Sequence, residues 1–224
     1  MFEYTFQWRV VWKHWPQLLE AGLLTLQLTI LSIIIGLAIA SVLAVFRDSS
    51  NPFAKYLSVT WVALARNTPA LLQIYMAYFG LGAFGIHLSP YTAVLAAVAF
   101  NNAGYLAEIL RGGFSSVPAS QKLAARGLGL TATQSYIYIT LPQVLQAVFL
   151  PIVNQVIWAM LATSLGMIIG LQELTGMTTF LQSQTFRPFE FYFVAACMYL
   201  VIAKIATILA HMVAAHMFKG GAVK

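Results

Sequence analysis

The chain has 224 residues, of which 60% are hydrophobic and only 8% are charged, and its formal net charge is +6. A soluble domain usually carries about 25% charged residues, so too few are present here to solvate a globular surface. The composition therefore excludes an ordinary soluble protein and predicts an all-α membrane protein. In such a chain, orientation signals and anionic lipid explain the positive charge better than nucleic acid does.

Residues 1–20 are expected to form an amphipathic segment ahead of the first span. Aromatic and aliphatic residues recur there at helical spacing between Val11 and Leu19, beside Lys13 and Gln17. This pattern is typical of a helix that lies among the lipid headgroups outside the membrane. An extension of the first span with an aromatic collar explains it equally well. The mixed charges before the apolar run do not indicate a cleavable signal peptide.

Residues 21–217 are expected to form one transmembrane domain of about five helices, since a span needs about 20 apolar residues. The expected spans cover residues 21–46, 56–79, 91–110, 141–169 and 191–217. Glycine, serine and proline residues predict turns between several of them, whereas residues 170–190 are mixed in character. A basic tail follows at residues 218–224.

Lysine and arginine residues predict an orientation with the N-terminus outside and the C-terminus inside. In that arrangement seven cations fall in inner segments: Arg47, Lys55, Arg111, Lys122, Arg126, Lys219 and Lys224. Three fall in outer segments: Arg9, Lys13 and Arg187. The segment of residues 111–140 therefore faces the cytoplasm.

The cytoplasmic segment carries the local signals of two short helices joined by a tight turn. Pro118 suits the first turn of a helix, and Gly127 or Gly129 is able to end it. Thr131 followed by Gln134 predicts a capping box for a second helix, which runs to the junction with the fourth span. Such a protruding element fits mechanical coupling to another protein, although an ordinary interfacial loop accounts for the same signals.

Two stretches of this segment resemble the cytoplasmic loop of ABC importer permeases. "LAARGLG" and "ITLP" match a pattern in which E-A-A-x-x-x-G is followed, after nine residues, by I-x-L-P. Further stretches, such as "RNTPALLQIYMAYFGLG" and "NNAGYLAEILRGGFSSVP", resemble the polar amino-acid uptake permeases of the histidine, glutamine and arginine type. The resemblance extends from about Gly22 to Leu209, and the chain is identified as a member of that family.

The resemblance implies a type I ABC importer permease fold in the bacterial inner membrane. It implies a subunit that forms half of the pathway for polar amino acids or related compounds. The implied partners are an ABC ATPase dimer, a second permease subunit, a periplasmic binding protein, the amino-acid substrate and membrane lipid. ATP and magnesium belong to the ATPase, because this chain has no G-x-x-x-x-G-K-[ST] loop. No catalytic residue, metal ligand or cofactor is expected in the chain itself.

The loop that the resemblance assigns to ATPase coupling also contains a departure from the family pattern. The assigned residues are Gln121, Leu123, Ala124, Ala125, Gly127, Gly129, Ile139, Leu141 and Pro142. Leu123 replaces the glutamate of the family and removes its usual contact with the ATPase. Leu161 and Ala162 replace a Lys–Asp pair, which predicts a non-identical second permease that retains such charges.

Polar residues within the spans are candidates for the substrate pathway, because they are costly to place in lipid. Pro69 is expected to kink the second span and to free a carbonyl group toward a cavity. The candidates are Arg66, Thr68, Asn101, Asn102, Asn154, Gln155, Thr163 and Ser164. Their amides suit the amino and carboxylate groups of an amino acid, but intramembrane amides also join helices.

The remaining ionisable residues have structural explanations. Glu108 is expected to pair with Arg66 or with Arg111, and Lys204 to reach the interface or a carboxylate. Cys197 lies in an apolar run and is expected to be buried. The histidines have no neighbours that suggest a zinc site.

Two other function classes fit the sequence less well. A secondary, ion-coupled amino-acid transporter would show inverted repeats with interrupted helices, which the sequence does not contain. A membrane enzyme would need a nucleophile and a base at matching depths, whereas the serine, histidine and aspartate residues are scattered.

Overall fold

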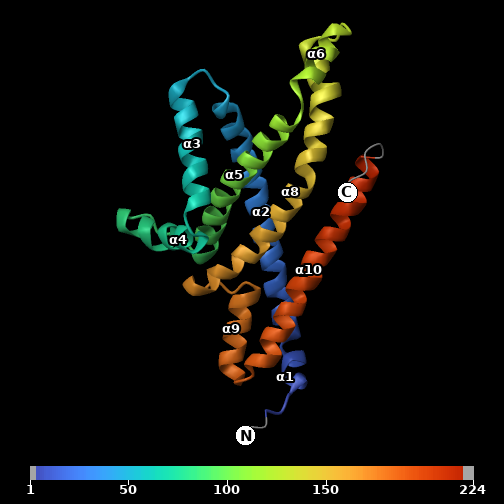
Figure 1. Cartoon of the computed structure of the whole chain (residues 1–224). Coiled ribbons are helices and arrows are strands. Elements are labelled where there is room, and N and C mark those ends of the chain that lie inside the picture. Colours follow the sequence, from blue (N-terminus) through green and yellow to red (C-terminus); the bar gives the residue numbers. More distant parts are fainter. Residues whose placement is uncertain (1–3, 219–224) are drawn as a thin grey trace.

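The computed structural model describes residues 4–218, and every regular element in that range is a helix (Figure 1). This confirms the expected all-α fold; the tail at 219–224, with Lys219 and Lys224, lies outside the described residues. The elements are α1 (Trp8–Lys13), α2 (Trp15–Arg47), α3 (Pro52–Asn67), α4 (Ala70–Tyr75), η1 (Met76–Gly80), η2 (Leu81–Phe84), α5 (Pro90–Ser116), α6 (Ala119–Gly127), α7 (Ala132–Ser135), η3 (Tyr136–Thr140), α8 (Leu141–Thr163), η4 (Ser164–Ile169), α9 (Leu174–Thr185) and α10 (Pro188–Met217).

Four helical runs in the described residues are long and apolar enough to cross a membrane. They are Trp15–Arg47, Pro90–Ser116, Ala132–Ile169 and Pro188–Met217. The fourth expected span matches α8 and η4 at both ends, and the fifth begins three residues early in α10 because Pro188 occupies the first helical turn. The first expected span was drawn too short, since α2 already begins at Trp15.

The second expected span, at residues 56–79, was wrong as a continuous helix. α3 ends at Asn67, and Thr68 adopts an extended backbone with φ −115° and ψ 142°. A residue before proline is pushed out of the helical region, so Pro69 separates α3 from α4. The apolar stretch after it continues as the short run Ala70–Phe84, which includes a π-helical and a 3-10 turn.

The carbonyl group of Ala65 shows the consequence of this break. Pro69 has no N–H group, so the carbonyl four residues before it has no helical donor. Two side-chain amides replace that donor: Gln73 Nε2 lies 3.0 Å and Asn101 Nδ2 lies 2.9 Å from Ala65 O. The prediction of a freed carbonyl is confirmed, but the carbonyl contacts side chains of the protein and not a cavity.

α5 is the central packing element, and glycines set its distance from three neighbouring helices. A Cβ atom on Gly36 of α2 would lie 2.7 Å from Asn102 Cβ, and one on Gly104 would lie 2.4 Å from Ala65 Cβ in α3. A Cβ atom on Gly113 would lie 2.2 Å from Val148 Cγ1 in α8. Small residues at such contacts let membrane helices approach closely. This packing also explains why α5 continues to Ser116, past its expected end at Leu110.

Residues 170–190 contain a helix that the sequence interpretation did not include. α9 begins after Glu173, whose carboxylate accepts a hydrogen bond from the Gly176 N–H group at 2.9 Å. A carboxylate in this position caps the free N–H groups of the first turn. α9 packs against α2 and α10 and so belongs to the helical core.

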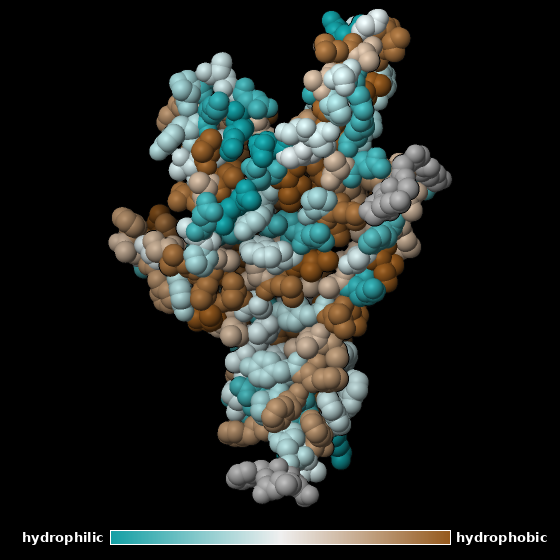
Figure 2. All heavy atoms as spheres, in the orientation of Figure 1, coloured by the Kyte–Doolittle hydropathy of each residue, from teal (hydrophilic) through white to brown (hydrophobic). Residues whose placement is uncertain are grey.

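The two ends of the molecule differ in their elements. Figure 1 shows α6, the α2–α3 turn and the last part of α10 toward one end, with α1 and α9 at the other. Figure 2 shows hydrophilic side chains gathered on the α3 and α6 side of this view, above a more hydrophobic middle. Cys197 was expected to be buried, but it is exposed, because little of α10 is covered by other helices.

Candidate functional site

The first candidate region is the tip formed by residues 118–140, hereafter the α6 tip. α6 ends in a pair of backbone hydrogen bonds, from Leu130 N to Ala125 O at 3.2 Å and from Gly129 N to Arg126 O at 3.1 Å. Gly129 supplies the left-handed conformation that this ending requires, with φ +87°. Of the two expected cap glycines, Gly129 is therefore the cap, and Gly127 lies within the helix.

The second helix of the tip begins with the predicted capping box. Gln134 N donates to Thr131 Oγ1 at 3.2 Å, and Thr131 N donates to Gln134 Oε1 at 2.8 Å. Both free backbone N–H groups are thus satisfied by side chains of the same turn. This part of the prediction is confirmed.

No break separates this second helix from the fourth span. α7, η3 and α8 form one helical run, and Pro142 lies inside its first α8 turn. A π-helical turn at Tyr136–Thr140 precedes Pro142. The expected junction at Pro142 was therefore wrong, and the α6 tip is joined directly to a membrane-crossing helix.

The residues assigned to coupling differ in their exposure. Leu123, Ala124, Gly127, Gly129 and Pro142 are exposed, whereas Ile139 and Leu141 are half-buried. Ala125 is only 5% exposed, in a helix that folds back on η3. Gln121 is exposed, and its Oε1 atom accepts from Gln143 Nε2 at 2.6 Å. The tip thus has an inner face that holds its shape and an outer face open to a partner.

The second candidate region is a set of buried amides where α2, α3, α5 and α8 cross, hereafter the amide junction. Asn102 Nδ2 donates to Ser32 Oγ at 3.2 Å, and Asn102 Oδ1 accepts from Gln155 Nε2 at 2.8 Å. Asn101 Nδ2 donates to Gln73 Oε1 at 3.0 Å as well as to Ala65 O. These bonds tie α5 to α2, α8, α3 and α4. In this structure the three candidate amides, those of Asn101, Asn102 and Gln155, therefore join helices.

One polar atom of the amide junction has no hydrogen bond within residues 4–218. Asn101 Oδ1 is buried and has no hydrogen-bond partner among the described residues. A buried polar atom in this state costs free energy, so it favours a water molecule or another donor at that point.

The other pathway candidates lie apart from the junction or bond locally. Thr163 Oγ1 and Ser164 Oγ each donate to a backbone carbonyl three residues earlier, at 2.8 and 2.6 Å. Thr68 Oγ1 donates to Leu64 O at 2.7 Å and accepts from Gln73 Nε2 at 2.8 Å. Asn154 is exposed on α8.

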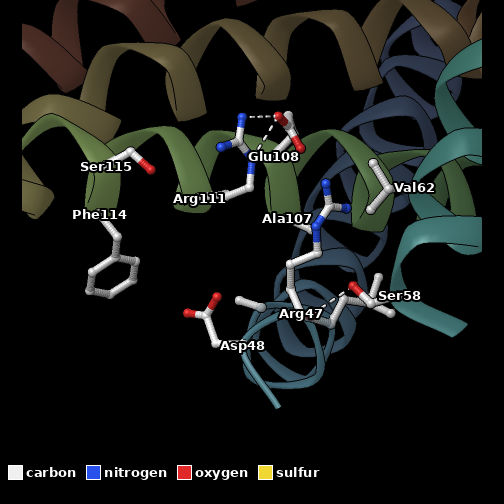
Figure 3. A pocket seen from close by; sticks show the side chains of 11 residues that line it. Arg47, Asp48, Ser58, Val62, Ala107, Glu108, Arg111, Phe114 and Ser115 are labelled. Carbon is white, nitrogen blue, oxygen red and sulfur yellow. Dashed lines mark hydrogen bonds and ion pairs between the residues drawn. The ribbon is translucent and has the colours of Figure 1, made fainter. Parts of the chain in front are cut away.

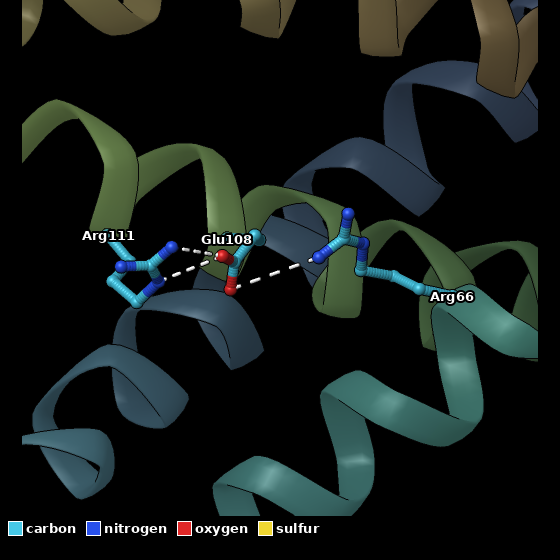
Figure 4. Close-up of polar contacts among 3 residues, drawn as sticks. All are labelled: Arg66, Glu108 and Arg111. Atoms are coloured by element: carbon cyan, nitrogen blue, oxygen red, sulfur yellow. Dashed lines mark hydrogen bonds and ion pairs between the residues drawn. The ribbon is translucent and has the colours of Figure 1, made fainter.

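The charged candidates form a cluster around Glu108. Arg111 binds the carboxylate through Nε at 2.8 Å and through Nη2, and Arg66 Nη1 lies 4.0 Å away on the other side (Figure 4). Both predicted partners of Glu108 are therefore present. The Arg66 guanidinium also lies 5.5 Å from the ring centroid of Tyr105, where a cation–π contact is favourable.

A small cavity of about 90 Å³ adjoins this cluster, at the end of the spans that carries the α2–α3 turn (Figure 3). Arg47 and Arg111 line it together with Asp48 and Glu108. These two cations and two carboxylates balance one another. The lining of the cavity is thus neutral overall, which does not favour a ligand of either charge.

Two buried carboxylates were not identified from the sequence. Glu173 Oε2 accepts from Thr25 Oγ1 at 3.2 Å and from Tyr199 OH at 2.8 Å. Glu190 accepts from Gln7 N at 2.8 Å and from the Tyr4 hydroxyl, which fixes the N-terminal segment to α10. Both lie in the mixed stretch 170–190; Glu173 has no basic residue near it in sequence, whereas Glu190 follows Arg187 by three positions.

Within residues 4–218, no group of three histidine, cysteine, aspartate or glutamate side chains could hold a metal ion.

The family that this architecture represents follows from comparison with known proteins. A family model described as the inner membrane component of binding-protein-dependent transport systems matches residues 32–219. The chain belongs to this family. The matched range includes both the α6 tip and the amide junction. The chain is therefore a membrane permease component and not a catalytic subunit.

Individual relatives agree with this assignment. The permease is 36% identical over 205 residues to the octopine transport system permease protein OccM of Rhizobium meliloti, with 88% of this chain and 84% of that protein covered. It is 31% identical over 199 residues to the glutamine transport system permease protein GlnP of Escherichia coli strain K12, with 88% and 91% covered.

A solved structure confirms the fold. A crystal structure described as an amino acid ABC transporter with histidines matches the permease with a TM-score of 0.89 at 30% identity, over 95% of this chain and all of that one. The type I ABC importer permease fold is thus confirmed, and an ABC importer component is favoured over a secondary transporter.

Proposed function

We propose that this permease forms half of the pathway of an ATP-driven importer for polar amino acids or related compounds such as opines. The relatives support the substrate class, because they are named for octopine and glutamine transport. ATP hydrolysis belongs to a separate ATPase dimer that contacts the α6 tip.

The observation that carries this proposal is the construction of the α6 tip. Its shape is fixed by the Gly129 cap and the Thr131 capping box, and it continues into a helical run that crosses the membrane. Leu123 and Ala124 face outward from it. A rigid and exposed element joined to a span is suited to transmit a movement of a soluble partner to the membrane helices.

The same arrangement supports a cytoplasmic location for the α6 tip. Arg47, Lys55, Lys122 and Arg126 belong to the α2–α3 and α6 end, whereas Arg9, Lys13 and Arg187 belong to the α1 and α9 end (Figure 1). An excess of cations marks the cytoplasmic side of a membrane protein. The N-terminus is then outside, the α1 and α9 end receives a periplasmic binding protein, and the location is the bacterial inner membrane.

The second permease subunit is proposed to be a different chain. Leu161, which stands at the lysine position of the family pattern that the chain resembles, is exposed on α8, and the neighbouring Ala162 is buried. A partner that retains such charges would supply what this chain lacks. Purification of a homodimer that transports without a second permease would contradict this part of the proposal.

Substrate contacts are proposed for the candidates whose polar groups are exposed. Asn154 is exposed on α8, and the Arg66 side chain is 41% exposed beside Glu108. Asn101, Asn102 and Gln155 are buried and bonded to other helices, so their role is to hold the walls of the pathway together.

The mechanism is alternating access. Closure of the ATPase dimer on ATP moves the two α6 tips together and opens the pathway outward, and hydrolysis releases it inward. Closure shifts this equilibrium only by the difference in its affinity for the two states. The contact at α6 must therefore be stronger in one state than in the other.

The test is reconstitution of the permease with its co-encoded ATPase, second permease and binding protein in liposomes. Uptake of labelled glutamine, arginine and octopine should require ATP inside and binding protein outside. In a Cys197→Ser background, Ala124→Cys should cross-link to the ATPase, while the buried Ala125→Cys should react poorly. Uptake driven by an ion gradient without the ATPase would contradict the proposal.

A further inference from the structure

The outer surface of the α6 tip is unusually apolar for an element in water. Leu123 is 72% exposed in α6, and Leu128, which directly follows this helix, is 82% exposed. At the tip, Figure 2 shows hydrophobic atoms beside hydrophilic ones. Ala125 and Ser135 are buried and hold the tip together, so the exposed leucines do not stabilise its fold. Exposed leucines gain free energy only when a partner covers them.

The length of the attached helix favours water over lipid around the tip. The run Ala132–Ile169 contains 38 residues, which corresponds to about 57 Å at 1.5 Å per residue. A bilayer with its headgroups is about 45 Å thick. Figure 1 shows the α6 tip at one extreme of the molecule, with α9 and α1 beyond the far end of this run. The run is thus long enough to place the α6 tip in water, beyond the headgroups.

The positive charge of the α6 tip predicts the charge of the partner surface. No aspartate or glutamate occurs between Glu108 and Glu173, whereas α6 carries Lys122 and Arg126. Arg126 Nη1 donates to Leu130 O at 2.9 Å, and the side chain of Lys122 is exposed. A partner surface that complements the tip is thus apolar where it meets the leucines and carries carboxylates around them.

We infer that Leu123 and Leu128 insert into an apolar pocket of the ATPase whose rim is acidic, an inference that rests on the proposed function. A pocket built for a glutamate at position 123 would present a cation, which leucine leaves without a partner. The permease therefore selects an ATPase surface that is apolar opposite Leu123. The α6 tip would thus discriminate among ATPases by charge as well as by shape.

The main test measures binding of the co-encoded ATPase to the complete permease complex in nanodiscs. Leu123→Glu should weaken binding about tenfold, as expected when a buried anchor is replaced by an unpaired charge. Leu123→Met, which preserves the apolar contact, and Ser120→Glu, which adds the same charge to the same helix, should each change it less than about threefold. Lys122→Glu should weaken binding at low salt, and this loss should shrink at high salt.

Two results would overturn the inference. Binding of Leu123→Glu as tight as that of the parent would show that a carboxylate is accepted at this position. An equal loss with Ser120→Glu would show a general charge effect and no apolar pocket at Leu123.

A labelling experiment separates the ATPase from lipid. Leu123→Cys in a Cys197→Ser background should react with a water-soluble maleimide in nanodiscs and should be protected when the ATPase is added. Protection by the lipid alone would contradict the inference. If Ala124→Cys fails to cross-link to the ATPase, the proposed function itself fails; if it cross-links while Leu123→Glu has no effect, only the apolar pocket is wrong.

Discussion

At the amide junction, Asn102 donates to Ser32 on α2 and accepts from Gln155 on α8, so its hydrogen bonds connect separate helices. At the α6 tip, Thr131 and Gln134 bond only within their own turn. The junction therefore depends on the relative positions of several helices. The tip keeps its shape by itself and leaves its outer surface for a partner.

The difference explains how one chain combines a fixed core with a contact surface. Buried amides in a membrane protein are satisfied only by other protein groups, and their loss separates helices. Local caps instead maintain a short helix in water without long-range contacts. Changes in the junction should therefore alter global stability, whereas changes in the tip should alter local order and ATPase binding.

The largest effect is expected from the glycine packing of α5 against α8. Gly113→Ala places a Cβ atom 2.2 Å from Val148 Cγ1, and the stiff valine has little freedom to move. We expect a loss of about 2–3 kcal/mol in the free energy of unfolding, measured by thermal denaturation in detergent. Gly112→Ala is the matched control, because nothing lies within 4 Å of its added Cβ atom. Equal melting of the two variants would contradict the close packing of α5 on α8.

The amide junction itself is tested by a double-mutant cycle. Asn102→Leu leaves the buried Gln155 amide without its acceptor and should cost about 2 kcal/mol. Adding Gln155→Leu should cost less than the sum of the two single changes, since the amides share one hydrogen bond. Asn154→Leu, on the exposed side of the same helix, should leave the unfolding temperature nearly unchanged. Strict additivity would show that the amides do not interact.

At the tip, the two glycines should respond with opposite signs. Gly129→Ala forces a side chain into the left-handed conformation and should reduce local stability by about 1–2 kcal/mol. Gly127→Ala lies inside α6 and should raise local stability by about 0.5–1 kcal/mol, because alanine favours a helix. Amide hydrogen exchange of α6 provides the measurement. A gain in both variants would contradict the cap at Gly129.

The smallest expected effect concerns the capping box. Thr131→Ala removes the acceptor for Gln134 N and should cost about 1 kcal/mol locally, with faster exchange of the Gln134 amide. Thr133→Ala, at the second residue of α7, should reduce local stability less, because Thr133 is not the N-cap. Because the cap is local, the unfolding temperature of the whole permease should not change. A global loss of stability would show that the tip is coupled to the junction.

Much of the fold was predictable because its signals are local. The capping box, the freed Ala65 carbonyl and the end of the fourth span at Ile169 follow from short patterns of residues. The break at Pro69 was also visible, but the surrounding apolar residues favoured an uninterrupted span. In this case the restriction that proline places on Thr68 outweighed hydrophobicity.

Other features could not be predicted because they depend on contacts between distant segments. Gly112 and Gly113 are typical of a helix end, yet α5 continues since Gly113 packs on Val148. Gln73 contacts Ala65, Thr68 and Asn101 only because α3 and α4 fold together beside α5. The carboxylate of Glu173 is accepted in the core because hydroxyl and N–H donors from three elements converge on it.

Under the proposed function, the continuous run from α7 to η4 would act as a lever arm. Because the helix is about 57 Å long, a rotation of about 10° about its membrane end displaces the other end by about 10 Å. A small tilt of the helix within the membrane and a large displacement of the α6 tip at the ATPase would then be the same motion. The π-helical turn at Tyr136–Thr140 lies near the end that would meet the ATPase, where bending of the helix would reduce that displacement.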